Sequence, residues 1–181
     1  DRKAQSSIAL WIPVFWISIS ASRMVSAWLQ PAPTMGTADQ YLEGSPVDRF
    51  LLSVLVALSL IVLATRGRRV VGFLQANGTL VLFFLYCALS VVWSDYPDVA
   101  FKRWIKNVGD LAMVLIVLTD LDPVAAVKRL LARVGFVLVP VSILFIKYYP
   151  DIGRGYNAFS WTTVYRGVAT DKNSLGMMCL I

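Results

Sequence analysis

Residues 50–69 read FLLSVLVALSLIVLATRGRR, and they set the class of the whole chain. From Phe50 to Thr65 the stretch carries no charge and is rich in leucine and valine. At about 1.5 Å of rise per residue, such a stretch is long enough to cross most of a bilayer core of about 30 Å. It closes on Arg66, Arg68 and Arg69, the densest basic cluster in the sequence. This pattern predicts a membrane helix with its basic end in the cytoplasm.

The rest of the chain repeats this pattern. Of its 181 residues 57% are hydrophobic and 15% charged, with a mean hydropathy of +0.66, which is far from the composition of a soluble domain. We therefore expect an all-α, polytopic integral membrane helical bundle forming a single transmembrane domain over 1–181, with a soluble helical bundle as the structural alternative. The expected spans are five, at about 8–29, 50–65, 74–93, 101–119 and 134–149, plus the start of a sixth at 171–181.

Both ends of the sequence suggest a truncated chain. It begins with Asp1 instead of methionine, and it stops at MMCLI, within an apolar run. We expect it to be a piece of a longer protein, so that part of any site would lie outside it.

Basic residues between the spans predict the topology. Two expected spans separate the N-terminus from the Arg66–Arg69 cluster, and two more separate that cluster from a short amphipathic helix predicted at Val124–Arg133. Segments separated by two spans lie on the same side of the membrane, and the positive-inside rule places all three in the cytoplasm. The segments 30–49, 94–107 and 150–170 then lie on the outer side. Three cations, Lys102, Arg103 and Lys106, are retained on that charge-poor side, and we interpret them as candidates for chemistry.

Composition also argues against several classes of function. The net charge of +6 comes from basic residues between apolar stretches, which indicates topology and not nucleic-acid binding. There is no histidine, and Cys87 and Cys179 lie inside apolar runs. Acids on the outer side show no ligand spacing. We expect no metal, no cofactor and no disulfide framework.

Polar residues gather at 165–176, YRGVATDKNSLG, just before the last apolar run. Asp171 or Thr170 is suited to cap a helix starting there, and a helix start also attracts anions through its free amides and dipole. With Gly167 as a flexible neighbour, Arg166, Lys172 and Asn173 are candidate ligands of a phosphate or pyrophosphate, together with Lys102, Arg103 and Lys106. The alternative is that these cations only anchor a membrane helix at the interface.

Arg23 and Asp110 form a second candidate pair. Each lies about 9 Å inside the outer end of its expected span, counted by helix rise. Charges within a membrane usually face the interior and pair, which predicts a structural ion pair. The alternative is that Arg23 extends to the lipid headgroups.

Two motifs give the chain a resemblance to the O-antigen ligase and polymerase family of bacterial cell-envelope proteins, which includes exopolysaccharide polymerases. One motif is LSVVWSDYPDVAFKRWIK at 89–106, and the other runs from Lys147 through YRGVATDKNSLG. The latter motif resembles the family's arginine and glycine followed by a lysine-asparagine pair and a leucine-glycine. Many members carry histidine or asparagine before that pair, where this chain has Asp171. The resemblance covers about 50–181, within the N-terminal half of such a protein.

This resemblance implies a metal-independent inverting glycosyltransferase of the bacterial inner (cytoplasmic) membrane, with its active face in the periplasm. It would move a glycan from undecaprenyl pyrophosphate, a lipid-linked oligosaccharide, to an acceptor glycan or lipid A core. The candidate cations would receive the departing pyrophosphate, and Trp104, Tyr156, Trp161 and Tyr165 would stack on sugars or mark the interface. The family's catalytic base lies on a later outer loop, and Asp151 and Asp171 are expected as turn or cap residues.

Two other classes stay open. A transporter or flippase for an anionic lipid-linked substrate would also use broken helices and internal charges, but with its binding groups near the bilayer midplane. A non-catalytic scaffold of polysaccharide assembly is the third class.

Overall fold

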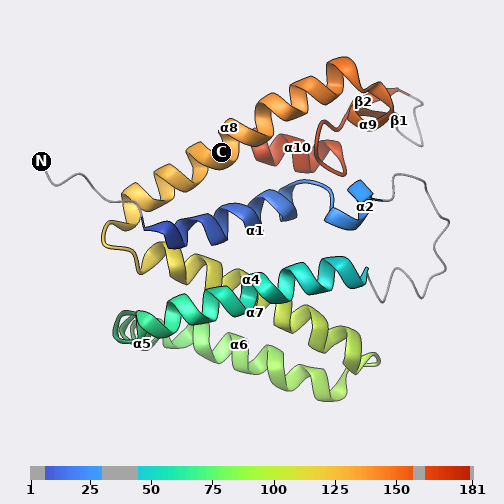
Figure 1. The fold of residues 1–181 in the computed structure, drawn as a ribbon. Coiled ribbons are helices and arrows are strands. Elements are labelled where there is room, and N and C mark those ends of the chain that lie inside the picture. The colour runs from blue at the N-terminus through green and yellow to red at the C-terminus, as the bar shows by residue number, and fades with distance from the viewer. Residues whose placement is uncertain (1–6, 30–44, 157–161, 180–181) are drawn as a thin grey trace, which may run out of the picture. The chain divides into compact units, whose positions relative to one another are not determined.

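The computed structural model describes residues 7–29, 45–156 and 162–179, which are mostly helical (Figure 1). The elements in chain order are η1 (Ile8–Leu10), α1 (Trp11–Ala21), α2 (Val25–Leu29), α4 (Pro46–Thr65), α5 (Gly67–Ala76), α6 (Gly78–Ser90), η2 (Val91–Trp93), α7 (Pro97–Leu118), α8 (Pro123–Tyr148), α9 (Pro150–Gly153), β1 (Arg154–Tyr156), β2 (Thr163–Tyr165) and α10 (Lys172–Cys179). They divide into two compact units. Of the described residues, unit 1 contains 7–13 and 45–126, and unit 2 contains 14–29, 127–156 and 162–179.

Two helices, α4 and α8, are long and apolar enough to cross a membrane. A third candidate is α5 with α6 and η2, which qualifies only as one broken segment because it bends by 90°. The helix α7 has the length, but 101–118 contains four charged residues, Lys102, Arg103, Lys106 and Asp110. The described part of the chain therefore holds two or three candidate spans by length and composition.

The span expected at 50–65 is a continuous helix, α4. It begins four residues earlier than expected, after Ser45, because Pro46 suits the first helical turn and Asp48 interacts favourably with the positive end of the helix. The span expected at 101–119 is helical, since it lies within α7, which starts at Pro97, but this helix is not among the candidate spans. Small residues are buried on both helices, Ser59 on α4 and Gly109 and Ala112 on α7, which permits the close approach of the two backbones.

The single helix expected at 8–29 is interrupted. The helix α1 passes through Pro13 and ends at Ala21, and α2 starts only at Val25. Between them the Ser22 hydroxyl and the Trp28 indole both donate to the backbone carbonyl of Arg23, at 3.2 and 3.1 Å. Such local side-chain bonds compete with helical bonds. The expected span is therefore a shorter apolar helix followed by a turn.

The helix expected at 74–93 is also divided, at Asn77. The Asn77 side chain donates to the carbonyl of Phe73 at 2.9 Å, and its backbone N–H donates to the carbonyls of Phe73 and Leu74. Asn77 and Gly78 form a dipeptide typical of turns, which the apolar composition around it concealed. Residues 74–76 thus belong to α5, and of the expected helix only α6 and η2 pack against α7.

The amphipathic helix expected at Val124–Arg133 and the span expected at 134–149 are one helix, α8. Asp122 begins it by accepting a hydrogen bond from the Ala125 N–H at 3.1 Å, and Pro140 lies inside it. The loop expected at 150–170 contains the short helix α9 and an antiparallel pair of strands, so the fold is mostly but not entirely helical. Arg154 pairs with Tyr165 and Tyr156 with Thr163. In the sequence, only the alternation of side chains in Thr163–Tyr165 is typical of a β-strand.

Two arginines of the basic cluster hold one end of unit 1 together. Arg66 donates to the carbonyl of Ile116 at 3.0 Å and to the Ser7 hydroxyl at 2.9 Å, and Arg69 donates to the carbonyl of Thr119 at 3.1 Å. Carbonyls in the last turn of a helix lack partners within the helix, so these guanidinium groups satisfy the end of α7. Since Arg66 follows the end of α4, the two helices run in the same direction.

Replacing Arg66 with lysine tests whether its stabilising role depends on its hydrogen bonds to the carbonyls or only on its positive charge. Lysine keeps the positive charge but not the planar fork that serves two acceptors, so Arg66→Lys should lower the free energy of unfolding by about 1.5–3 kcal/mol. Thermal unfolding in detergent measures this. The matched control is Arg68→Lys on the exposed side of the same cluster, which should cost no more than about 0.5 kcal/mol. Equal losses in the two variants would contradict the capping role.

Candidate anion site in unit 2

Arg166 lies where the strand β2 ends and a buried turn begins. Its backbone N–H and that of Gly167 donate to the carbonyl of Gly153 at 2.8 and 3.0 Å. Its own carbonyl accepts from the Ala169 N–H at 3.1 Å. These bonds fix the backbone that carries the most prominent candidate side chain.

Gly167 is not the flexible neighbour that the sequence suggested. It is buried, with a φ of +58°, the left-handed region that favours glycine. A Cβ at this position would lie 2.6 Å from the Cβ of Ser142 on α8. The Ser142 hydroxyl also accepts a hydrogen bond from the Val168 N–H at 3.3 Å. This glycine therefore locks the Arg166 turn onto α8.

The side chain of Arg166 is half-buried and lies against Gly155 of β1, where even a methyl group would meet the guanidinium. Across the described ranges it makes no hydrogen bond or ion pair. Neighbouring Arg154, which sequence reasoning passed over, is already engaged: it donates to the carbonyl of Ile146 at 2.9 Å, at the end of α8. Within these ranges, the charge of Arg166 is therefore not bound to an acceptor.

Arg23 lies beside this turn. Its guanidinium donates to the backbone carbonyls of Ile152 and Ala169, and it lies over the Trp28 ring at 5.8 Å from the centroid. Arg166 is near enough for its positive charge to act on that of Arg23. Two guanidinium groups close enough to repel each other favour an anion that contacts both.

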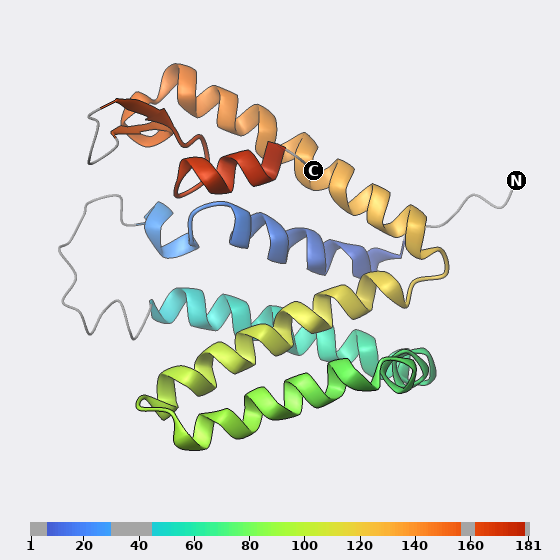
Figure 2. The same cartoon turned by 180° about the vertical axis from the view of Figure 1, so that it is seen from behind.

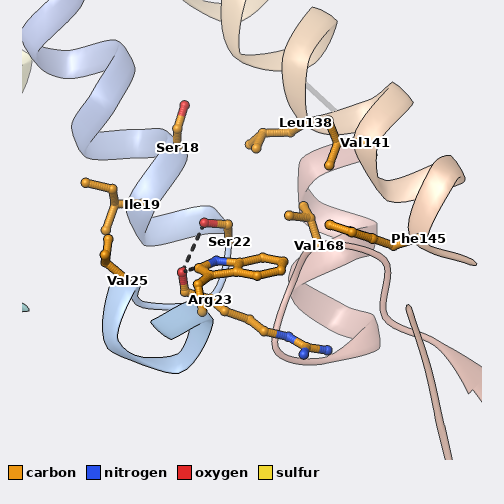
Figure 3. A pocket seen from close by; sticks show the side chains of 10 residues that line it. Ser18, Ile19, Ser22, Arg23, Val25, Leu138, Val141, Phe145 and Val168 are labelled. Carbon is orange, nitrogen blue, oxygen red and sulfur yellow. Dashed lines mark hydrogen bonds between the residues drawn. The ribbon is translucent and has the colours of Figure 1, made fainter. Parts of the chain in front are cut away.

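An apolar cavity of about 360 Å³ opens beside Arg23 (Figure 3). One side comes from the end of α1 and from α2, the other from α8 and Val168, and the Trp28 and Phe145 rings stack at 5.4 Å. The full lining is Ser18, Ile19, Ser22, Arg23, Val25, Trp28, Leu138, Val141, Phe145 and Val168. An apolar wall with a cation at its edge suits an amphiphilic anion.

Asp171 caps α10, as the sequence predicted. Its carboxylate accepts hydrogen bonds from the N–H groups of Asn173 and Ser174 at 2.8 and 3.0 Å, and from the Ser174 hydroxyl at 2.7 Å. These bonds, the Ser174 bonds first, lower the pKa of Asp171. Two of the amides that a phosphate would use at this helix start are thus bonded to the protein's own carboxylate. Lys172 and Asn173 are exposed in the first turn, with their side chains open to solvent.

The remaining candidates belong to unit 1, so their grouping with Arg166 stays a prediction. Lys102, Arg103 and Lys106 are exposed on the first turns of α7. Trp104 has a structural role, since its indole donates to the carbonyl of Phe84 on α6 at 3.2 Å. Trp161, another of the aromatic residues expected to stack on sugars or mark the interface, lies outside the described residues.

The other sequence-based predictions have different outcomes. Asp110 is exposed on α7 in unit 1 and Arg23 belongs to unit 2, so their ion pair also stays a prediction. Asp151 lies exposed in the first turn of α9, in keeping with a turn residue. Within the described ranges, no group of three histidine, cysteine, aspartate or glutamate side chains is arranged to hold a metal ion.

The lock at Gly167 is testable with a methyl group. Gly167→Ala should destabilise the protein by more than the left-handed strain of about 1–2 kcal/mol, because the methyl also meets Ser142. The matched control is Gly176→Ala on α10, where a Cβ meets open space and alanine gains up to about 1 kcal/mol of helix propensity. Thermal unfolding of both variants in detergent would show opposite shifts, and a neutral Gly167→Ala would refute the lock.

The Asp171 cap predicts a pH dependence. Because its pKa is lowered in the folded state, the cap stabilises the start of α10 above the ordinary aspartate pKa of about 3.9 and is lost as pH falls through the lowered value. Amide exchange at Asn173 and Ser174, corrected for intrinsic rates, should accelerate below about pH 4. Asp171→Ala should remove the protection at all pH values, whereas Asp151→Asn should leave it unchanged. Unchanged protection in Asp171→Ala would rule out the cap.

Comparisons with protein-family models, with curated proteins and with solved structures found no match to this chain. The resemblance to the O-antigen ligase and polymerase family therefore stays a prediction from the two sequence motifs.

Proposed function

We propose that this chain is part of a membrane glycosyltransferase that moves a glycan from undecaprenyl pyrophosphate to an acceptor saccharide or to lipid A core. One observation carries the proposal. Arg166, without a partner in the described part of the chain, lies near Arg23, and Arg23 borders an apolar cavity. A polyprenyl pyrophosphate needs both features, a cationic group for its diphosphate and an apolar wall for its chain.

The proposed setting is the bacterial inner membrane, with five spans and the start of a sixth and a cytoplasmic N-terminus. The contacts of Arg66 support this topology. They join Ser7, which follows the N-terminus, to the end of α4 and the end of α7. The positive-inside rule independently assigns these three points to the same side. The opposite ends, with Arg166 and the Lys102–Lys106 segment, then belong to the periplasmic side.

The chemistry follows from charge. When the bond from the anomeric carbon to the pyrophosphate oxygen breaks, negative charge grows on the leaving group and must be stabilised. A guanidinium grips two phosphate oxygens at once, whereas Lys172 or Lys102 acts as a point charge. The acceptor hydroxyl also needs a base, and Asp171 is engaged as a cap. The resemblance implies that such a base lies on a later outer loop.

A transporter or flippase for an anionic lipid-linked substrate is the second candidate. The interruption of the first expected span at Ser22–Met24, with Arg23 within it, favours this reading, because broken helices with charged groups are typical of transporters. The two candidates differ in their products. A transferase forms a new glycosidic bond, while a flippase only moves the intact lipid across the bilayer.

The test uses the complete protein in proteoliposomes with a glycan on undecaprenyl pyrophosphate and an acceptor. Arg166→Ala should reduce transfer about 10²–10³-fold at unchanged protein level, and Arg166→Lys should recover part of it. The control Arg49→Ala removes an exposed cation in the first turn of α4 and should retain full transfer. Wild-type transfer by Arg166→Ala would dismiss the pyrophosphate role. Movement of the lipid without a new glycosidic bond would favour the flippase.

A further inference from the structure

The helix α5 lies across the direction of its neighbours in unit 1. It makes a 90° angle with α6, and it follows α4 after a single turn at Arg66. In both views of the ribbon α5 is seen nearly end-on while α4 and α6 run lengthwise (Figures 1 and 2). If α4 and α6 stand across a bilayer, α5 lies in the plane of its surface.

The sequence of α5, GRRVVGFLQA, has two faces. At about 100° per residue, four apolar side chains share one side, and Arg68 and Gln75 share the other. The apolar ones are Val70, Val71, Phe73 and Leu74. No residue of α5 is fully buried, and Val71 is 52% exposed. The rest of unit 1 therefore covers the apolar face only in part.

The arginines at this end of unit 1 differ in their hydrogen bonds. Arg66 and Arg69 donate to α7, whereas Arg68 is exposed and has no partner in the described ranges. Among the residues that the structure describes, the acids at this end of unit 1 are Asp120 and Asp122. Each carboxylate accepts a backbone N–H, from Leu121 at 2.8 Å and from Ala125 at 3.1 Å. As far as the described residues go, Arg68 thus presents an unpaired positive charge beside a half-covered apolar face.

We propose that α5 is an interfacial helix that lies in the cytoplasmic leaflet and binds the headgroups of anionic phospholipids through Arg68. The short, amphipathic helix with its cation on the polar face is the form that such surface helices take. Its perpendicular direction favours the interface over a broken span, because a segment crossing the hydrocarbon would carry Arg68 into it. This inference does not depend on the glycosyltransferase proposal.

Spin labels on α5 test its depth. In the full chain with Cys87 and Cys179 replaced by alanine, Val71→Cys on the apolar side and Gly72→Cys on the side of Arg68 are labelled, and the protein is placed in nanodiscs. The label at 71 should collide mainly with dissolved oxygen, which concentrates in lipid, and the label at 72 mainly with a water-soluble nickel complex. Labels along 68–76 should alternate between these two behaviours with the helical period. A steady increase of oxygen collisions along the helix would show a crossing segment and overturn the proposal.

The headgroup part is tested by lipid composition. Replacing part of the phosphatidylcholine with phosphatidylglycerol should lower the nickel accessibility of the label at 72, because anionic lipid draws the helix closer. Arg68→Gln should abolish this difference, and added salt should weaken it. The matched control Arg49→Gln, at the other end of α4, should leave it intact. Equal accessibility in the two lipids, or full water exposure of both labels as in a surface kept for a protein partner, would refute lipid binding.

Discussion

The fold depends on hydrogen bonds from arginine guanidinium groups to backbone carbonyls at the ends of helices and turns. A bilayer core contains no water to satisfy these groups, and the last four carbonyls of a helix lack internal partners. Arg66 and Arg69 serve the end of α7, and Arg154 serves the end of α8. Arg23 joins the break after α1 to the turns at Ile152 and Ala169. Each unit is thus held at its ends by cations in addition to its apolar packing.

This use of arginine changes how the basic residues are interpreted. A sequence shows many cations near the membrane surface, and each is a candidate ligand. The structure separates those that already donate to carbonyls from those whose charge is available. Arg154 belongs to the first group, although it neighbours the candidate site. Arg166 and Arg68 belong to the second in the described part of the chain, and they carry the two proposals.

The sequence predicted the features that local physics determines. Charge-free composition located α4, the spacing of apolar residues located α7, and Asp171 was recognised as a cap because its donors lie two and three residues away. The predictions of continuous helices failed where a local polar group ends a helix within an apolar stretch. Averaged hydropathy did not register the turn at Asn77, and the carbonyl of Arg23 accepts side-chain donors that end α1. The contacts of Arg23 join positions 129 and 146 residues apart, so no sequence spacing could reveal them.

The parallel course of α4 and α7 has an electrostatic consequence. Each helix carries a partial charge of about −0.5 at its C-terminus, and two helices pointing the same way bring these like partial charges together. The guanidinium groups of Arg66 and Arg69 act as their counter-ions. The cluster that the positive-inside rule predicts to be cytoplasmic therefore also neutralises the negative ends of two packed helices. In the predicted topology, loss of its charge would act twice, first on the orientation at insertion and again on the packed helices.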